Sequence, residues 1–161
     1  MFSEFQWYSG LNIDLSMRLF RFFLLFLLPL FAISDGVSAS EAALAVVVAK
    51  TSKIESISKR ELVDVYMGRF DVLESGHKVQ PVDYENGTEL RSLFYRSLVN
   101  KSERQINAYW SRLIFSGRAK PPVQVASPEE SLSFILDNQS ALSYIPVNRV
   151  SEEMKIVLVL E

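Results

Sequence analysis

The sequence has no cysteine, a single histidine and almost no imbalance of charge. Without cysteine there is no disulfide, no thiolate metal site and no thiol catalysis, so packing and hydrogen bonds alone must hold the fold. With His77 as the one histidine, a histidine-rich metal site is excluded, and a Ser/His/Asp triad would have to use a turn residue. A net charge of −2 gives no basis for nucleic-acid binding. We therefore expect no metal, no cofactor, no nucleic-acid partner and no enzymatic activity.

The chain also lacks an apolar run long enough to cross a bilayer near its N-terminus. The run from Phe22 to Ile33 has 12 residues and contains Pro29, whereas a membrane-spanning helix needs about 20. Arg18 and Arg21 precede this run, and Val37-Ser38-Ala39 follows it. A short apolar run with basic residues before it and small residues after it is typical of a secretory signal peptide. The pattern predicts export to the periplasm, with an uncleaved membrane anchor as the alternative.

The boundaries of this predicted signal peptide are residues 1–39. Glu4 and Asp14 are unusual in the basic first part of a signal peptide, whereas Met17 begins a compact basic segment, which indicates Met17 as the true start. Cleavage after Ala39 would leave residues 40–161, a chain of 122 residues with 15 basic and 16 acidic side chains. That length suits one domain with a modest core.

The rest of the chain alternates between apolar runs typical of strands and amphipathic helical patterns. Strands are predicted at 43–49, 79–83, 123–126, 141–145 and 155–160, and helices at 59–67, from 88, from 102 and at 128–138. The first run is apolar throughout and rich in valine, as in a strand buried on both faces. Pro81 places the second strand near a sheet edge or a bulge. This alternation predicts a layered α/β domain.

Three helix starts carry capping signals. Ser58 and Glu61 form one capping box pattern, and Ser102 with Gln105 forms another. Ser127 followed by proline is the strongest start, because it joins a capping side chain to a proline at the first helical position. After the second box, the helical spacing of the apolar residues predicts a helix that buries Ile106, Tyr109, Trp110, Leu113 and Ile114.

The segment from Val82 to Arg91 is the best candidate for a binding site, because it joins a strand to the start of a helix. The first amides of a helix lack internal partners and carry the positive end of its dipole, so they can bind an oxyanion. Gly87 would allow close approach of a ligand, Thr88 offers a hydroxyl, and Arg91 offers a planar cation one turn along. The alternative is that Asn86 or Thr88 only caps the helix and Arg91 is a solvated surface residue.

Four blocks of the sequence together resemble the phosphate ABC transporter substrate-binding family. They share the order and spacing of that family's helix, strand, phosphate loop and final strand, over roughly residues 43–146. The blocks are Ile57-Ser-Lys-Arg-Glu-Leu-Val-Asp-Val-Tyr-Met-Gly-Arg69, Val79-Gln-Pro-Val-Asp83, Asn86-Gly-Thr-Glu-Leu-Arg-Ser-Leu-Phe94 and Ala141-Leu-Ser-Tyr-Ile-Pro146.

The resemblance implies a periplasmic-binding-protein type II-like fold, an α/β domain with a central mixed sheet flanked by helices. The length of this chain corresponds to a single lobe. Carried over by position, the ligand-binding residues for phosphate or a similar oxyanion are Asn86, Gly87, Thr88 and Arg91. The implied partners are that oxyanion and an ABC transporter permease or another envelope protein. The single-lobe length leaves open a ligand-free interaction or sensor module with the same fold.

Overall fold

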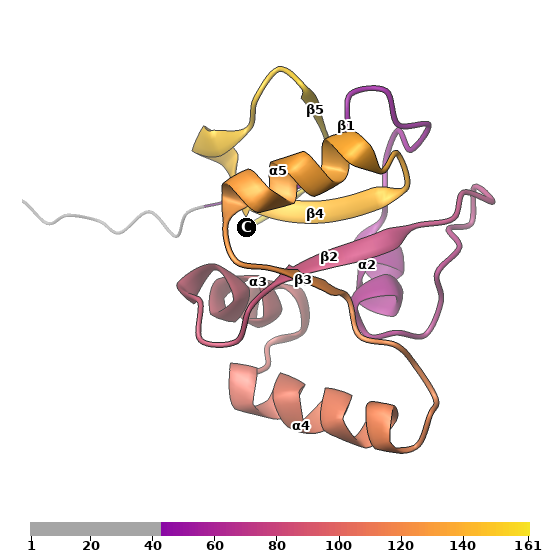
Figure 1. Cartoon of the computed structure of the whole chain (residues 1–161), viewed down its shortest axis with the longest axis vertical. Coiled ribbons are helices and arrows are strands. Elements are labelled where there is room, and N and C mark those ends of the chain that lie inside the picture. The colour runs from indigo at the N-terminus through magenta and orange to yellow at the C-terminus, as the bar shows by residue number, and fades with distance from the viewer. Residues whose placement is uncertain (1–42) are drawn as a thin grey trace, which may run out of the picture. The chain divides into compact units, whose positions relative to one another are not determined.

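The computed structural model describes residues 43–161, so the predicted signal peptide, the alternative start at Met17 and the Ala39 cleavage point lie outside the described residues. Within these residues, no helix combines the length and apolar character needed to cross a membrane. Five strands and several helices alternate along this part of the chain (Figure 1). The predicted α/β class, with a central mixed sheet flanked by helices, is confirmed.

The sheet has the strand order β3-β2-β4-β1-β5. Its strands are β1 (Leu44–Ala49), β2 (Gln80–Tyr84), β3 (Val123–Val125), β4 (Ala141–Pro146) and β5 (Met154–Leu160). β1 pairs antiparallel with β4 and β5, whereas β2 pairs parallel with β3 and β4. All six residues of β1 are buried, as expected for an apolar strand covered on both faces.

The helices are α2 (Lys59–Tyr66), α3 (Glu89–Val99), α4 (Glu103–Phe115) and α5 (Pro128–Asp137), with a 3₁₀ turn, η1 (Val147–Arg149). In Figure 1, α5 lies across β4, α2 and α3 lie near β2, and α4 lies apart from the sheet. The three predicted starts are confirmed, because Ser58, Ser102 and Ser127 each accept a hydrogen bond from the backbone amide three residues later. Local capping chemistry therefore determines where these helices begin.

The strand that contains Pro81, β2, lies next to the edge strand β3, as the prediction of a place near a sheet edge requires, but it is not itself an edge strand, because it has a neighbour on each side. The two neighbours pair with different parts of β2, however. β4 pairs at Gln80 and Pro81, and β3 pairs only from Val82 onward. Proline is therefore tolerated here because it lies where the strand has only one paired neighbour.

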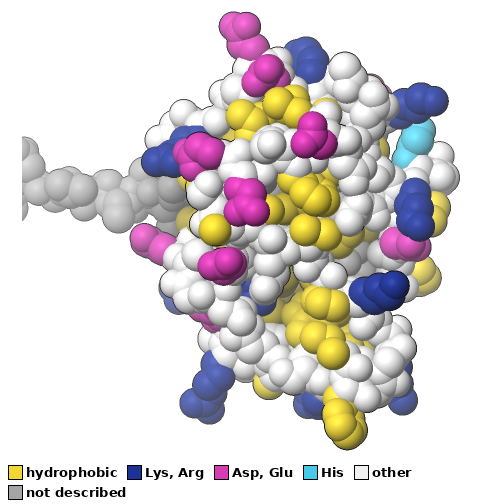
Figure 2. Space-filling model, viewed as in Figure 1, with side chains coloured by type: hydrophobic (Ala, Val, Ile, Leu, Met, Phe, Trp, Pro, Cys, Tyr) yellow, Lys and Arg dark blue, Asp and Glu magenta, His cyan; other side chains and the backbone are white. Residues whose placement is uncertain are grey.

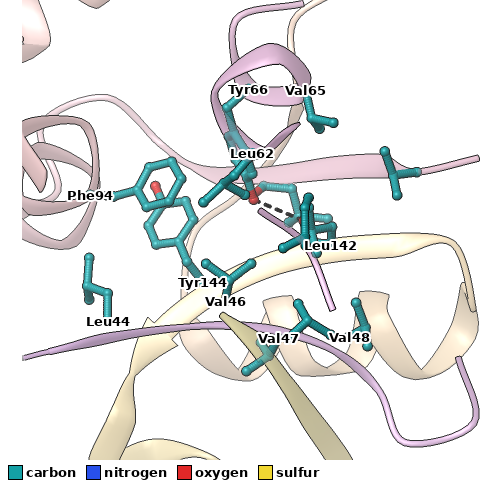
Figure 3. Close-up of a cluster of buried hydrophobic side chains, with 14 of the residues drawn as sticks. Leu44, Val46, Val47, Val48, Leu62, Val65, Tyr66, Phe94, Leu142 and Tyr144 are labelled. Carbon is teal, nitrogen blue, oxygen red and sulfur yellow. Dashed lines mark hydrogen bonds between the residues drawn. The ribbon is translucent and has the colours of Figure 1, made fainter. Parts of the chain in front are cut away.

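Aromatic side chains join the helices to the sheet. Tyr144 of β4 stacks on Phe94 of α3 with ring centroids 3.6 Å apart, as the parallel rings in Figure 3 show. The Tyr66 hydroxyl of α2 lies 2.9 Å from the carbonyl oxygen of Val82 and 3.0 Å from that of Leu142. It thus connects β2 to β4, two strands that share only two paired positions. These contacts fix α3, and with it the candidate loop, against the centre of the sheet.

The helix α4 buries less than its sequence pattern predicted. Ile106 and Trp110 are buried, and Tyr109 and Leu113 are partly buried, but Ile114 is 53% exposed. The prediction for Ile114 was wrong. Phe115, the last residue of α4, is 95% exposed. Helical spacing identifies an apolar face but not how much of it a neighbouring element covers, and α4 lies at the margin of the domain.

Candidate functional site

The candidate loop lies between β2 and α3, as predicted. Thr88 is the N-cap of α3: its hydroxyl oxygen accepts a hydrogen bond from the Arg91 amide and its O–H group donates to the Glu85 carbonyl. Gly87 has φ +89°, a backbone conformation that favours glycine, and open space surrounds the position of its missing Cβ. Asn86 is exposed. The capping alternative for Thr88 is therefore confirmed, and it is compatible with an anion at the same helix terminus.

Arg91 is not a solvated surface residue, because its side chain is only 3% exposed. Its Nε donates to Asp83 Oδ2 at 3.0 Å, and its Nη1 donates to Glu103 Oε1 at 3.1 Å and to Asn107 Oδ1 at 3.0 Å. Within the described residues, the remaining guanidinium nitrogen, Nη2, makes no such hydrogen bond. Burial works against the charged guanidinium, but the neighbouring Asp83 raises the pKa of Arg91.

Asp83, at the end of β2, is the centre of a buried polar cluster. One carboxylate oxygen accepts from the Tyr84 amide and the Tyr144 hydroxyl, and the other accepts from Arg91 Nε and the Tyr95 hydroxyl at 2.8 Å. Burial, with the charge of Asp83 as a further cause, raises the pKa values of Tyr95 and Tyr144 well above the ordinary tyrosine value, so both hydroxyls stay protonated donors. Four donors satisfy this carboxylate, which leaves it no capacity to bind a ligand.

Glu103, the first residue of α4, occupies the N-terminal end of α3. Its Oε1 accepts from the Gly87 amide at 2.5 Å and from Arg91 Nη1, and its Oε2 accepts from the Ser92 hydroxyl at 3.1 Å. The hydrogen bond from Gly87 is the largest cause that lowers the pKa of Glu103, and Ser92 and Arg91 add to it. A carboxylate of the protein itself thus lies where the sequence predicted an oxyanion.

Sequence reasoning missed Glu103 and Ser92. Ser92 lies within the segment 86–94, and its polar side chain, one residue after Arg91, was the signal that could have identified it. Glu103 lies 16 positions after Gly87. The sequence indicates only that Glu103 lies in the first turn of a capped helix, where an acidic residue is expected to interact favourably with the dipole of that same helix. No sequence pattern places it against a different helix.

A groove of about 450 Å³ opens beside this helix terminus. The predicted residues Asn86 and Arg91 line it, whereas Gly87 and Thr88 do not. Its other walls come from β2, α4, β3 and the segment leading into β3: Asp83, Asn107, Trp110, Ser111, Ile114, Pro121, Pro122 and Gln124. In Figure 2, hydrophobic side chains gather on the part of the visible face where α4 and the segment before β3 lie in Figure 1. The groove therefore combines a buried cation with an apolar wall.

Other constellations remain unsupported. His77 lies in a loop, where its ring contacts the Ser75 hydroxyl at 3.0 Å. No group of three or more acidic or histidine side chains suited to a metal ion occurs between residues 43 and 161.

Together, the sheet order and the loop that leads from β2 to the N-terminus of α3 characterise this α/β fold. In comparisons of structure, the chain is similar to an ABC-type phosphate transport receptor from Vibrio cholerae, with a TM-score of 0.56, 17% identity and coverage of 73% of this chain and 47% of the receptor. It is also similar to a substrate-binding protein assigned to phosphate ABC transport in Clostridium perfringens, solved with bound phosphate (TM-score 0.56, 15% identity, 73% and 45% coverage). PstS from Borrelia burgdorferi is a third such structure (TM-score 0.52, 13% identity, 75% and 51% coverage).

The chain spans about half the length of these solved structures, so the likeness covers one part of them, as the predicted single lobe requires. The three solved structures are a transport receptor, a substrate-binding protein and PstS. No family model matches the sequence. No curated protein matches it either. At identities of 13% to 17%, this structural similarity shows the fold alone.

Proposed function

We propose that this protein is a periplasmic solute-binding-like protein that binds phosphate or a related oxyanion at the N-terminus of α3. The observation that carries the proposal is the Glu103 carboxylate, which takes hydrogen bonds there from a backbone amide, a guanidinium and a hydroxyl. The Glu103 carboxylate is itself an oxyanion group, and the donors of Gly87, Arg91 and Ser92 converge on its two oxygens. The proposed ligand-binding residues are Asn86, Gly87, Thr88 and Arg91, with Ser92 as an addition.

The chemistry of this terminus suits a small anion. Gly87 leaves the backbone accessible, and the dipole of α3 adds positive potential at its first turn. Arg91 adds a full positive charge that Asp83 holds in place from the opposite side. Arg91 and Asn86 both line the groove, and Nη2 of Arg91 and the side-chain amide of Asn86 are further potential donors. A ligand that enters through the groove would therefore meet donors that the fold already orients.

The N-terminal sequence and the fold support the proposed location in the periplasm and the proposed partner. Residues 1–39 carry the signal-peptide pattern, and one similar structure is an ABC-type phosphate transport receptor. An ABC transporter permease or another envelope protein is the proposed macromolecular partner. Contact with the membrane is then confined to the signal peptide before cleavage.

The test is a titration with phosphate, using protein produced from the full chain. A ligand that binds only the folded state raises the melting temperature as its concentration increases. We expect phosphate to raise it, with chloride at matched ionic strength having no effect and sulfate reporting selectivity. Asn86→Ala should reduce the shift, whereas Asn148→Ala, at an exposed position of η1, should not. No shift with phosphate or sulfate at about 10 mM, on the order of the weakest specific affinities, would contradict the proposal.

Arg91→Ala is a poor test variant for this site. Removing the guanidinium would leave the Asp83 carboxylate buried without its cation, and a lost buried ion-pair partner destabilises a protein by about 3–5 kcal/mol. A lost phosphate effect in that variant would then report unfolding as much as binding. Asn86 is exposed, so its replacement separates the two effects.

A ligand-free interaction or sensor module is the second candidate. Two observations favour it. Arg91 already contacts two carboxylates of the protein, Asp83 and Glu103, and Ile114 and Phe115 at the end of α4 are 53% and 95% exposed. Exposed aromatic and aliphatic residues beside a groove are common in protein interfaces. Absence of any anion effect on stability, together with binding of an envelope protein that Phe115→Ser abolishes, would favour this candidate.

A further inference from the structure

The Glu103 carboxylate lies between the starts of two helices. It belongs to the first residue of α4, and it accepts a hydrogen bond from the backbone amide of Gly87, the residue immediately before the N-cap of α3. Its side chain is 20% exposed, so solvent reaches it, whereas its partner Arg91 is 3% exposed. The carboxylate is therefore at the rim of the site, and the guanidinium is beneath it.

The donors that hold Glu103 are fixed independently of Glu103. Thr88 caps α3 and orients its first turn, and Asp83 holds Arg91 through Nε. α4 is capped by Ser102 and Gln105 in a reciprocal capping box, in which Glu103 takes no part. Loss of the Glu103 carboxylate would thus leave three donors in nearly the same places, and the charge of Arg91 would then be balanced by Asp83 alone.

A second anion cannot share this position. Two anions at hydrogen-bonding distance from the same amide and guanidinium would repel each other, and both would need the same N–H donors. The carboxylate has the further advantage of being tethered, because an intramolecular group acts at a high effective concentration. Arg91 lines the groove, and its Nη2 makes no hydrogen bond within the described residues, so Nη2 is the guanidinium nitrogen left for an incoming anion.

We infer that Glu103 is an internal competitor of the oxyanion, so that a ligand binds at the N-terminus of α3 only by displacing the Glu103 carboxylate from Gly87, Arg91 and Ser92. The inference rests on the proposed function, and it assigns regulation to the same site. Glu103 sets the threshold concentration of oxyanion at which the protein responds. The displaced carboxylate would turn to solvent at the start of α4, where it still complements the dipole of that helix.

The first experiment compares phosphate binding by the wild-type chain, Glu103→Ala and Glu89→Ala, measured by calorimetry at matched ionic strength. Glu89 is the matched control, because it is an exposed glutamate in the first turn of α3 and its removal changes the net charge by the same amount. We expect Glu103→Ala to bind phosphate at least tenfold more tightly than wild type. Glu89→Ala should change the affinity about twofold or less, as expected for an exposed charge.

A second experiment uses acetate, a free carboxylate, and does not depend on phosphate. In Glu103→Ala, acetate can occupy the position that the side chain vacated and should raise the melting temperature as its concentration increases. Wild type and Glu89→Ala should show no acetate effect beyond that of chloride. Glu103→Gln keeps the size of the side chain without the charge, and it serves as a second variant in both experiments if Glu103→Ala is poorly folded.

The outcomes separate the inference from the proposed function. Equal phosphate affinity in wild type and Glu103→Ala, with binding present in both, would overturn the inference while the proposed function stands. Acetate stabilisation of Glu103→Ala without phosphate binding in any variant would support the role of Glu103 and contradict phosphate as the ligand. Neither acetate nor phosphate acting on Glu103→Ala would overturn both.

Discussion

The two polar clusters that share Arg91 differ in how completely they are satisfied. Around Asp83, four donors meet two carboxylate oxygens inside the core, and the residue is 2% exposed. Around Glu103, three donors meet a carboxylate that is 20% exposed and opens on solvent. The carboxylate of the inner cluster has no free acceptor capacity for an outside group, whereas that of the outer cluster lies at the solvent boundary, where we propose that it exchanges with another anion. Burial thus decides which end of Arg91 serves structure and which is available for binding.

The comparison requires that the inner cluster matter most for stability. In Asp83→Asn, Arg91 would lose the more buried of its two counter-charges, and one side-chain oxygen would be replaced by an amide nitrogen that cannot accept a hydrogen bond. We expect a loss of about 3–5 kcal/mol of unfolding free energy, as for other broken buried ion pairs. Urea denaturation of Asp83→Asn and of Asp71→Asn, a variant at an exposed ion pair, measures the difference. A loss below about 1 kcal/mol, the range of surface ion pairs, would remove the distinction between the two clusters.

Deleting one donor of the inner cluster should have an intermediate effect. Tyr144→Phe removes a hydroxyl that donates to Asp83 but keeps the ring stacked on Phe94. We expect a loss of about 1–3 kcal/mol, because a buried carboxylate loses a charge-assisted hydrogen bond. Tyr109→Phe is the control, since its half-buried hydroxyl donates to the Met67 carbonyl, a neutral acceptor. Similar losses in the two variants, measured by thermal unfolding, would argue against a special role for the buried charge.

Gly87→Ala tests whether the loop needs its backbone conformation. Gly87 has φ +89°, and no atom lies within 4 Å of the place that an alanine Cβ would take, so the substitution adds conformational strain without a clash. We expect a loss of about 1 kcal/mol in unfolding free energy and weaker phosphate binding. Gly76→Ala, at φ +81° and also in open space, provides the matched control for strain away from the site. Equal effects of both variants on phosphate binding would disconnect the loop from the ligand.

The smallest expected effect is the pH dependence that Glu103 contributes to stability. Its pKa is lowered in the folded state, so its stabilising contribution is complete above the ordinary glutamate value of 4.5 and is lost as the pH falls through the lowered pKa. The stability difference between wild type and Glu103→Gln should therefore be constant from about pH 7 to about 5 and shrink below about 4. Urea titrations across this range check it. A difference that grows on acidification would mean that the carboxylate is not stabilised by Gly87 and Arg91.

Much of the fold was determined by the sequence alone. The valine-rich run of β1, the capping residues Ser58, Ser102 and Ser127, and the spacing of apolar residues in α3 act over a few positions, so their effect can be read locally. Helix starts depend on hydrogen bonds between residues three apart, and strand burial depends on the composition of a single run. The position of the candidate loop, between β2 and α3, followed from the same local signals.

Only the tertiary structure decided the state of the site. The pairing of Glu103 with Gly87 and Ser92, the burial of Arg91 and the exposure of Ile114 all depend on where α4 lies relative to α3 and the sheet. The same holds for Pro81, whose tolerance depends on the offset between two neighbouring strands. Contacts between residues distant in sequence depend on the packing of whole elements, and no local pattern specifies them. The sequence thus predicted an oxyanion site at the start of α3, and the packing of α4 places the carboxylate of Glu103 at that position.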